Sequence, residues 1–63
     1  MKIGLWDYLS DNGYRRAVVI ADDKIMAYDN CPLAIFPKQF NLVKWLGESS
    51  EEEIRLVLDA QKD

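Results

Sequence analysis

Histidine is absent from this 63-residue chain, which removes the side chain best suited to proton transfer near neutral pH. The single cysteine excludes an internal disulfide bond and a metal site built from several cysteines. Three widely separated glycines form no glycine-rich phosphate-binding loop, and no apolar run approaches the roughly 18 residues of a membrane-spanning helix. We therefore expect a protein that is not an enzyme, that holds no cofactor or metal, and that does not span a membrane.

The length and composition indicate one small globular domain over residues 1–63. Hydrophobic residues make up 49% of the chain and charged residues 30%, an ordinary globular composition. Surface scaling gives about 4,200 Å² of accessible surface for a compact chain of this size. Such a domain has little spare stability, so association with a partner or with a second copy would help it. The formal net charge of −3 argues against a general binder of nucleic acids or membrane surfaces.

The N-terminal residues predict a cytoplasmic location. The apolar segment of a signal peptide is missing near the N-terminus, where the chain carries Trp6, Asp7 and Tyr8 instead. A lone cysteine also fits a reducing compartment.

Residues 14–21 show the clearest β-strand pattern, because β-branched side chains fill the middle of this segment. Asp22 and Asp23 follow, and aspartate favours tight turns. The sequence therefore predicts a hairpin whose next strand covers residues 24–29.

The first segment has two interpretations, a strand over residues 2–9 or a helix over residues 4–11, since its apolar positions fit both periods. The cross-strand register favours the strand. With a loop near residues 10–13, Asp7 faces Arg16, and a tight second turn brings Asp29 to the other side of the same arginine. These opposite charges favour a three-stranded antiparallel meander.

Two helices are expected after the sheet, over residues 37–46 and 50–61. Apolar residues recur at helical spacing in both segments, and Gly47 is a natural end for the first helix. Ser49 or Ser50 can begin the second helix, because each precedes a glutamate, Glu52 or Glu53, by the three residues of a capping box.

The predicted fold is therefore α+β, with a three-stranded antiparallel meander over residues 2–9, 14–21 and 24–29 followed by the two helices. The alternative is an N-terminal helix, a β-hairpin and the same two C-terminal helices.

One face of this meander carries residue types that are enriched at the centres of protein interfaces. Two short helices cover one face of a sheet well but hardly two, which would leave this face open to a partner. The candidate protein-binding residues are Trp6, Tyr8, Arg15, Met26 and Tyr28. The alternative is that one helix covers each face and these aromatics belong to the core.

Other possible sites have simpler interpretations. Cys31 has no histidine to activate it and is expected to be a small buried residue. An arginine between Asp7 and Asp29 would hold both carboxylates ionised, which opposes a division into general acid and general base. Arg15 and Arg16 are adjacent on a strand and so point to opposite faces, which weakens a nucleic-acid interpretation.

The sequence thus favours a non-catalytic module that binds a larger protein, as a cytoplasmic modulator or inhibitor. Small acidic proteins of this kind are common among the accessory genes of phages and mobile elements. A structural homo-oligomer or subunit of a larger assembly, and a weakly nucleic-acid-associated protein, are the alternatives.

Overall fold

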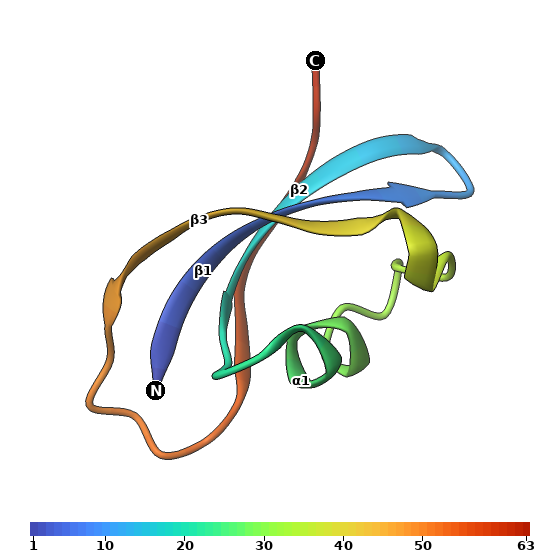
Figure 1. Ribbon diagram of the computed structural model, residues 1–63. Helices are drawn as coiled ribbons and strands as arrows, with labels where there is room; N and C mark the ends of the chain where they lie inside the picture. The colour runs from blue at the N-terminus through green and yellow to red at the C-terminus, as the bar shows by residue number, and fades with distance from the viewer.

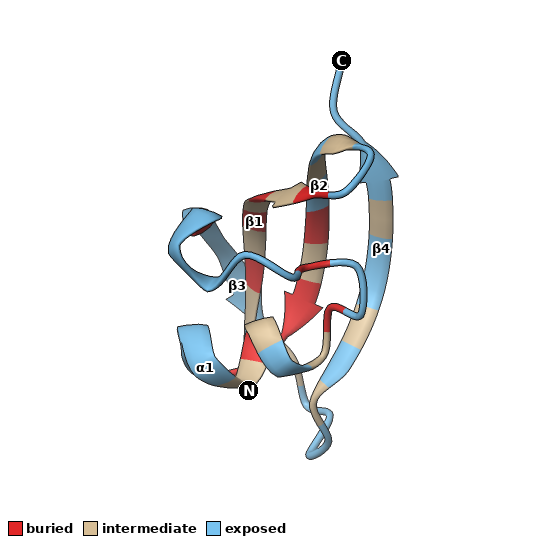
Figure 2. Ribbon diagram, turned by 90° about the vertical axis from the view of Figure 1, so that its right-hand side faces the viewer, coloured by how far each residue is buried: buried red, intermediate tan, exposed pale blue.

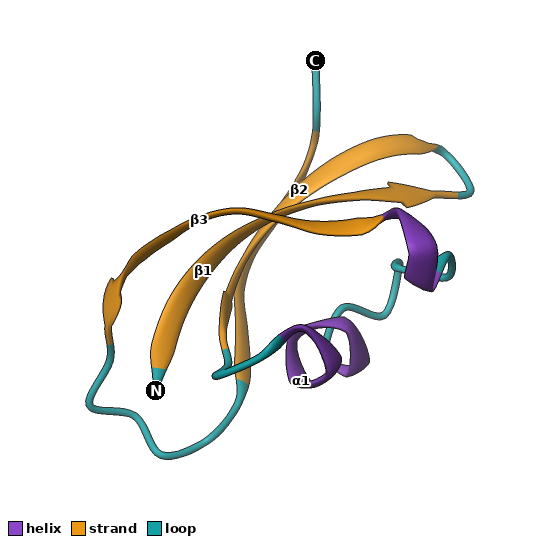
Figure 3. Ribbon diagram, viewed as in Figure 1, coloured by secondary structure: helices purple, strands orange, loops and turns teal.

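The computed structural model describes all residues 1–63 and contains one four-stranded antiparallel sheet with a short helix on one side (Figures 1 and 3). The central hairpin is flanked by the two C-terminal strands, in the order β3-β1-β2-β4. The elements are β1 (Lys2–Ser10), β2 (Gly13–Ile20), α1 (Lys24–Asp29), the 3-10 helix η1 (Pro37–Gln39), β3 (Phe40–Glu48) and β4 (Arg55–Gln61).

The hairpin of β1 and β2 has the register that the charges predicted. Asp7 lies opposite Arg16, and the strand interpretation of the first segment is confirmed over the helix alternative. Ser10 pairs with Gly13 around a two-residue turn, and its hydroxyl donates to the Gly13 carbonyl at 2.8 Å. Gly13 has φ +105°, a conformation that other residues rarely adopt, so glycine suits this end of the turn.

The predicted third strand over residues 24–29 is wrong, because this segment is the helix α1. Asp23 is the N-cap residue of α1 and not part of a hairpin turn. Its side chain accepts a hydrogen bond from the Met26 amide at 2.9 Å, which satisfies a free N–H of the first turn. As a result, the meander does not form and Asp29 does not reach Arg16.

The two helices predicted over residues 37–46 and 50–61 are also wrong, because these segments form η1 with β3, and β4. β-Bulges explain the misleading pattern. The pairing of β3 with β1 shifts twice, so Asn41, Lys44 and Gly47 lie opposite alternate residues of β1. Each bulge adds one residue, and side chains on one face then recur every three positions instead of every two. This spacing resembles the period of a helix.

The core lies between the sheet and the layer formed by α1 and the segment that follows it (Figure 2). Trp6 of β1 stacks on Phe40 of β3 with ring centroids 4.9 Å apart, and Tyr28 of α1 meets Phe40 edge-on at 5.6 Å. Both Trp6 and Phe40 are buried. The accessible surface of 4147 Å² confirms the value expected for a compact chain of this size. None of the helices has the length and apolar character needed to cross a membrane.

Gly4 of β1 makes room for two tryptophans. A Cβ atom at this position would lie 2.6 Å from Nε1 of Trp6 and 3.0 Å from the ring of Trp45. The Trp6 Nε1–H has no hydrogen-bond partner, and the Trp45 ring stands nearly perpendicular to the Trp6 ring at 5.9 Å. The two indoles therefore meet edge to face over a backbone position where only hydrogen fits.

Candidate protein-binding face

The five residues predicted as a binding site lie on the side of the sheet that faces α1. Trp6 and Tyr8 are core residues with 2% and 1% of their surface exposed. Met26 and Tyr28 are half-buried and pack against the same core from α1. Arg15 is occupied by an ion pair with Asp59. Trp6 and Tyr8 thus belong to the core, as in the alternative interpretation, although a helix covers one side of the sheet and not both.

A polar cluster joins the core to β4. The Tyr8 hydroxyl donates to Oδ2 of Asp59 at 2.6 Å, and Nε of Arg15 donates to Oδ1 at 3.0 Å. Burial raises the pKa of the Tyr8 phenol well above its usual value, and the hydrogen bond to Asp59 raises it further. Burial also raises the pKa of the nearby Cys31 thiol to about 12. Both groups stay protonated at neutral pH, so neither is an activated nucleophile.

The opposite side of the sheet carries no helix, and we call it the open face (Figure 1). The register shows which side chains it presents, because alternate residues of a strand point to one face and directly paired residues share that face. Three of its apolar side chains, Tyr14, Val43 and Leu58, are 56%, 45% and 59% exposed. The open face consists of Ile3, Leu5, Asp7, Leu9, Tyr14, Arg16, Val18, Asn41, Val43, Lys44, Arg55, Leu58, Ala60 and Lys62.

A three-residue ion cluster lies in the middle of the open face. Nε and Nη2 of Arg16 donate to the two carboxylate oxygens of Asp7 at 2.7 and 3.2 Å, which confirms the predicted pair. Lys62, just beyond β4, donates to Oδ2 of Asp7 at 2.7 Å, and Ala60 of β4 lies opposite Arg16 where Asp29 was predicted. Arg16 first, and Lys62 with it, lower the pKa of Asp7 to about 2 against the opposing effect of burial. The Asp7 carboxylate therefore pairs with two cations, Arg16 and Lys62, and the cluster has a net positive charge.

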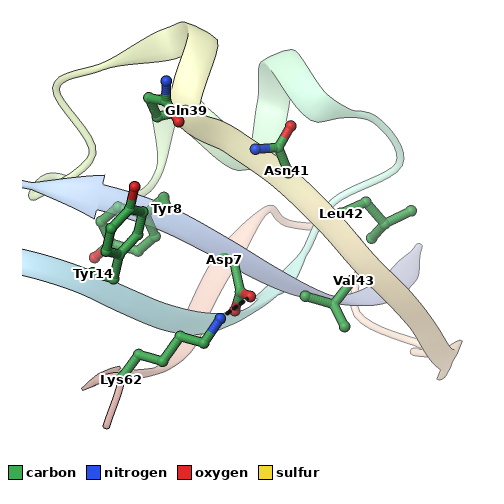
Figure 4. Close-up of a pocket in the computed structure, with 8 residues that line it drawn as sticks. All are labelled: Asp7, Tyr8, Tyr14, Gln39, Asn41, Leu42, Val43 and Lys62. Carbon is green, nitrogen blue, oxygen red and sulfur yellow. Dashed lines mark hydrogen bonds and ion pairs between the residues drawn. The ribbon is translucent and has the colours of Figure 1, made fainter.

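A cleft of about 290 Å³ opens beside this cluster (Figure 4). Figure 4 shows the Lys62 ammonium group meeting Asp7 at the cleft, with Tyr14 on one side and Val43 on the other. Apolar and hydrogen-bonding groups thus line the same small hollow, as in sites that accept a side chain or a small ligand. Its lining residues are Asp7, Tyr8, Tyr14, Gln39, Asn41, Leu42, Val43 and Lys62.

The sequence did not indicate Asp59 and Lys62, because Asp59 belongs to the segment that was interpreted as a helix and Lys62 directly follows it. The alternation of apolar and polar residues from Leu58 to Gln61 was the available signal for a strand, and the bulge at Val57 interrupts that pattern. Comparisons with protein-family models, curated proteins and solved structures found no match.

Proposed function

We propose that this chain is a non-catalytic protein-binding module, which modulates or inhibits a larger protein by docking the open face onto it. The exposure of large apolar side chains on this face carries the proposal. Tyr14, Val43 and Leu58 project from three different strands of a hydrogen-bonded sheet, so they form a preorganised surface. Exposed apolar groups of this kind, surrounded by charged residues, are typical of protein–protein contacts.

The chemistry of the open face also favours binding over catalysis. Asp7 is held ionised by Arg16 and Lys62, and a carboxylate with a pKa of about 2 has no proton to donate at neutral pH. The face offers hydrogen bonds and apolar contacts, which serve recognition. The cytoplasmic location and the likeness to phage accessory proteins remain predictions from the sequence.

Paired substitutions on the two sides of the molecule test this proposal. The Val43→Gln/Leu58→Gln variant removes exposed aliphatic groups from the open face at nearly constant volume. The Ile25→Gln/Leu33→Gln variant does the same on α1 and the following segment, where these side chains are 73% and 47% exposed. Each variant is checked for folding by its thermal unfolding curve and then used, beside the wild type, in affinity capture from the native host.

The proposal expects a discrete larger protein that is captured by the wild type and by the α1-side variant. Capture by the open-face variant should fall about tenfold or more, since interface anchors contribute about 1–2 kcal/mol each. Equal capture by all three folded proteins would place the interface elsewhere. If the folded wild type captures only its own copies, the structural homo-oligomer becomes the better account.

A further inference from the structure

The middle of the open face is basic although the chain as a whole is acidic. Besides Arg16 and Lys62, the register places Lys44 opposite Leu5 on the same side of the sheet, and Asp7 is the one carboxylate among these side chains. Arg55 lies at the end of the face, where the loop before β4 surrounds it with Glu51, Glu52 and Glu53. Three cations against one carboxylate leave two positive charges in the middle of the face, whereas the chain has a formal net charge of −3.

Hydrogen-bond donors without partners gather at the cleft in the same face. The Lys62 ammonium group has three N–H donors and uses one of them on Asp7. The side chains of Tyr14 and Asn41, which line the cleft with it, make no hydrogen bond within the protein. An ammonium, a phenol and an amide thus line one hollow, and each of these groups can donate a hydrogen bond to a carboxylate.

The positive charge in the middle of the open face limits the kind of molecule that can bind there. Two copies that met through their open faces would bring like charges together, which disfavours a symmetric dimer there. A single-stranded nucleic acid needs several aromatic rings on which bases stack, and Tyr14 is the one aromatic side chain on this face. Aliphatic side chains lie around the cations of this face. A surface of this composition is complementary to a polypeptide that carries both apolar and acidic side chains.

We infer that the partner presents an extended acidic segment to the open face, with a glutamate or aspartate carboxylate entering the cleft beside Lys62 and a second one reaching Lys44. Apolar side chains of the segment would cover Val43 and Leu58. This inference rests on the proposed function and adds to it the chemistry of the partner.

Peptide titrations followed by ¹⁵N–¹H correlation spectra of the full chain test the inference. The probes are the blocked pentapeptides acetyl-Val-Glu-Val-Glu-Val-amide and acetyl-Val-Gln-Val-Gln-Val-amide, which differ only in charge. The glutamate peptide should shift the resonances of Asn41, Val43 and Lys62. The glutamine peptide should bind about fivefold more weakly or worse. Raising NaCl from about 0.05 to 0.5 M should remove most of that difference.

Two charge-matched variants locate the effect. Lys44→Gln/Lys62→Gln removes two cations from the open face, and Lys2→Gln/Lys24→Gln removes two from outside it. The first should weaken binding of the glutamate peptide about fivefold or more, and the second should leave it within about twofold. All four substituted lysines are exposed, and the spectra themselves report whether each variant is folded.

Equal binding of the two peptides, or equal loss in both lysine variants, would overturn the inference. Stronger shifts of the same resonances by a short oligothymidylate would overturn it in favour of a nucleic acid. The proposed function has a separate outcome, because it depends on capture lost in Val43→Gln/Leu58→Gln. If that loss occurs while Lys44→Gln/Lys62→Gln captures the same protein normally, the open face binds a partner but not through carboxylates.

Discussion

Removal of the Asp59 carboxylate should destabilise the protein, because this group accepts hydrogen bonds from two side chains of the central hairpin. Asp59 is the acceptor for the Tyr8 hydroxyl at 2.6 Å and for Nε of Arg15 at 3.0 Å. Tyr8 is 1% exposed, so its hydroxyl cannot turn to solvent when the carboxylate is lost. The Asp59→Ala variant therefore leaves a buried donor without a partner next to the hydrophobic core.

The magnitude follows from these two contacts. A buried donor left unsatisfied costs about 1–3 kcal/mol. The ion pair with Arg15 is partly exposed and adds about 0.2–1 kcal/mol. We expect Asp59→Ala to lower the free energy of unfolding by about 1–4 kcal/mol, from a total of roughly 3–9 kcal/mol for a chain of this length. The melting temperature should fall by about 5 °C or more.

Urea denaturation followed by tryptophan fluorescence measures these values for Asp59→Ala, Tyr8→Phe and the double variant. The double variant has no buried hydroxyl to satisfy, so its destabilisation should be smaller than the sum of the two single effects by about 1–2 kcal/mol. If the two effects add within about 0.5 kcal/mol, the hydrogen bond does not hold β4 to the core and the argument is refuted.

Three further predictions concern the core, the ion cluster and the thiol. Gly4→Ala should lower the unfolding free energy by about 1–3 kcal/mol in the same assay, because its Cβ would lie 2.6 Å from Nε1 of the buried Trp6; an unchanged midpoint would contradict the close packing. The pKa of Asp7 is lowered to about 2, so the cluster stabilises the fold above about pH 4 and this contribution is lost as the pH falls towards 2. The wild type should lose about 1 kcal/mol across that window in pH-dependent urea titrations, after allowance for the exposure of Arg16 and Lys62, and Asp7→Asn should lack this loss. Cys31 is 2% exposed with a pKa of about 12, so a thiol reagent at pH 8 should modify it only through unfolding, and rapid reaction in native buffer would contradict its burial.

The sequence was informative where strand pairing is regular. Between β1 and β2 the alternation of side chains and the Asp7–Arg16 pair determine the register, and both are local to one hairpin. The pattern failed where bulges interrupt β3 and β4, since an added residue changes the period of the exposed side chains from two towards three. The hairpin turn predicted at Asp22 and Asp23 was wrong for another reason. Aspartate favours both hairpin turns and the N-cap position of a helix, and Asp23 is the N-cap of α1.

The candidate site depends on these same elements. Arg16 and Asp7 could be placed together from the sequence, because they face each other across one turn. Lys62 could not be placed with them, since it is 55 residues away from Asp7 and arrives through the pairing of β4 with β2. The burial of Trp6 and Tyr8 likewise depends on which face of the sheet α1 covers, and tertiary packing determines that face.

Site-specific photocrosslinking tests the central claim, binding of a larger protein by the open face, most directly. A photoreactive phenylalanine analogue is placed at Tyr14 of the open face in one sample and at Ile25 of α1 in another, and the chain is irradiated in its native host. Both positions are more than half exposed, so they report on the two sides of the molecule with similar access. The account predicts one discrete adduct, larger than a dimer of this chain, from the Tyr14 position alone. An adduct from the Ile25 position alone would contradict it.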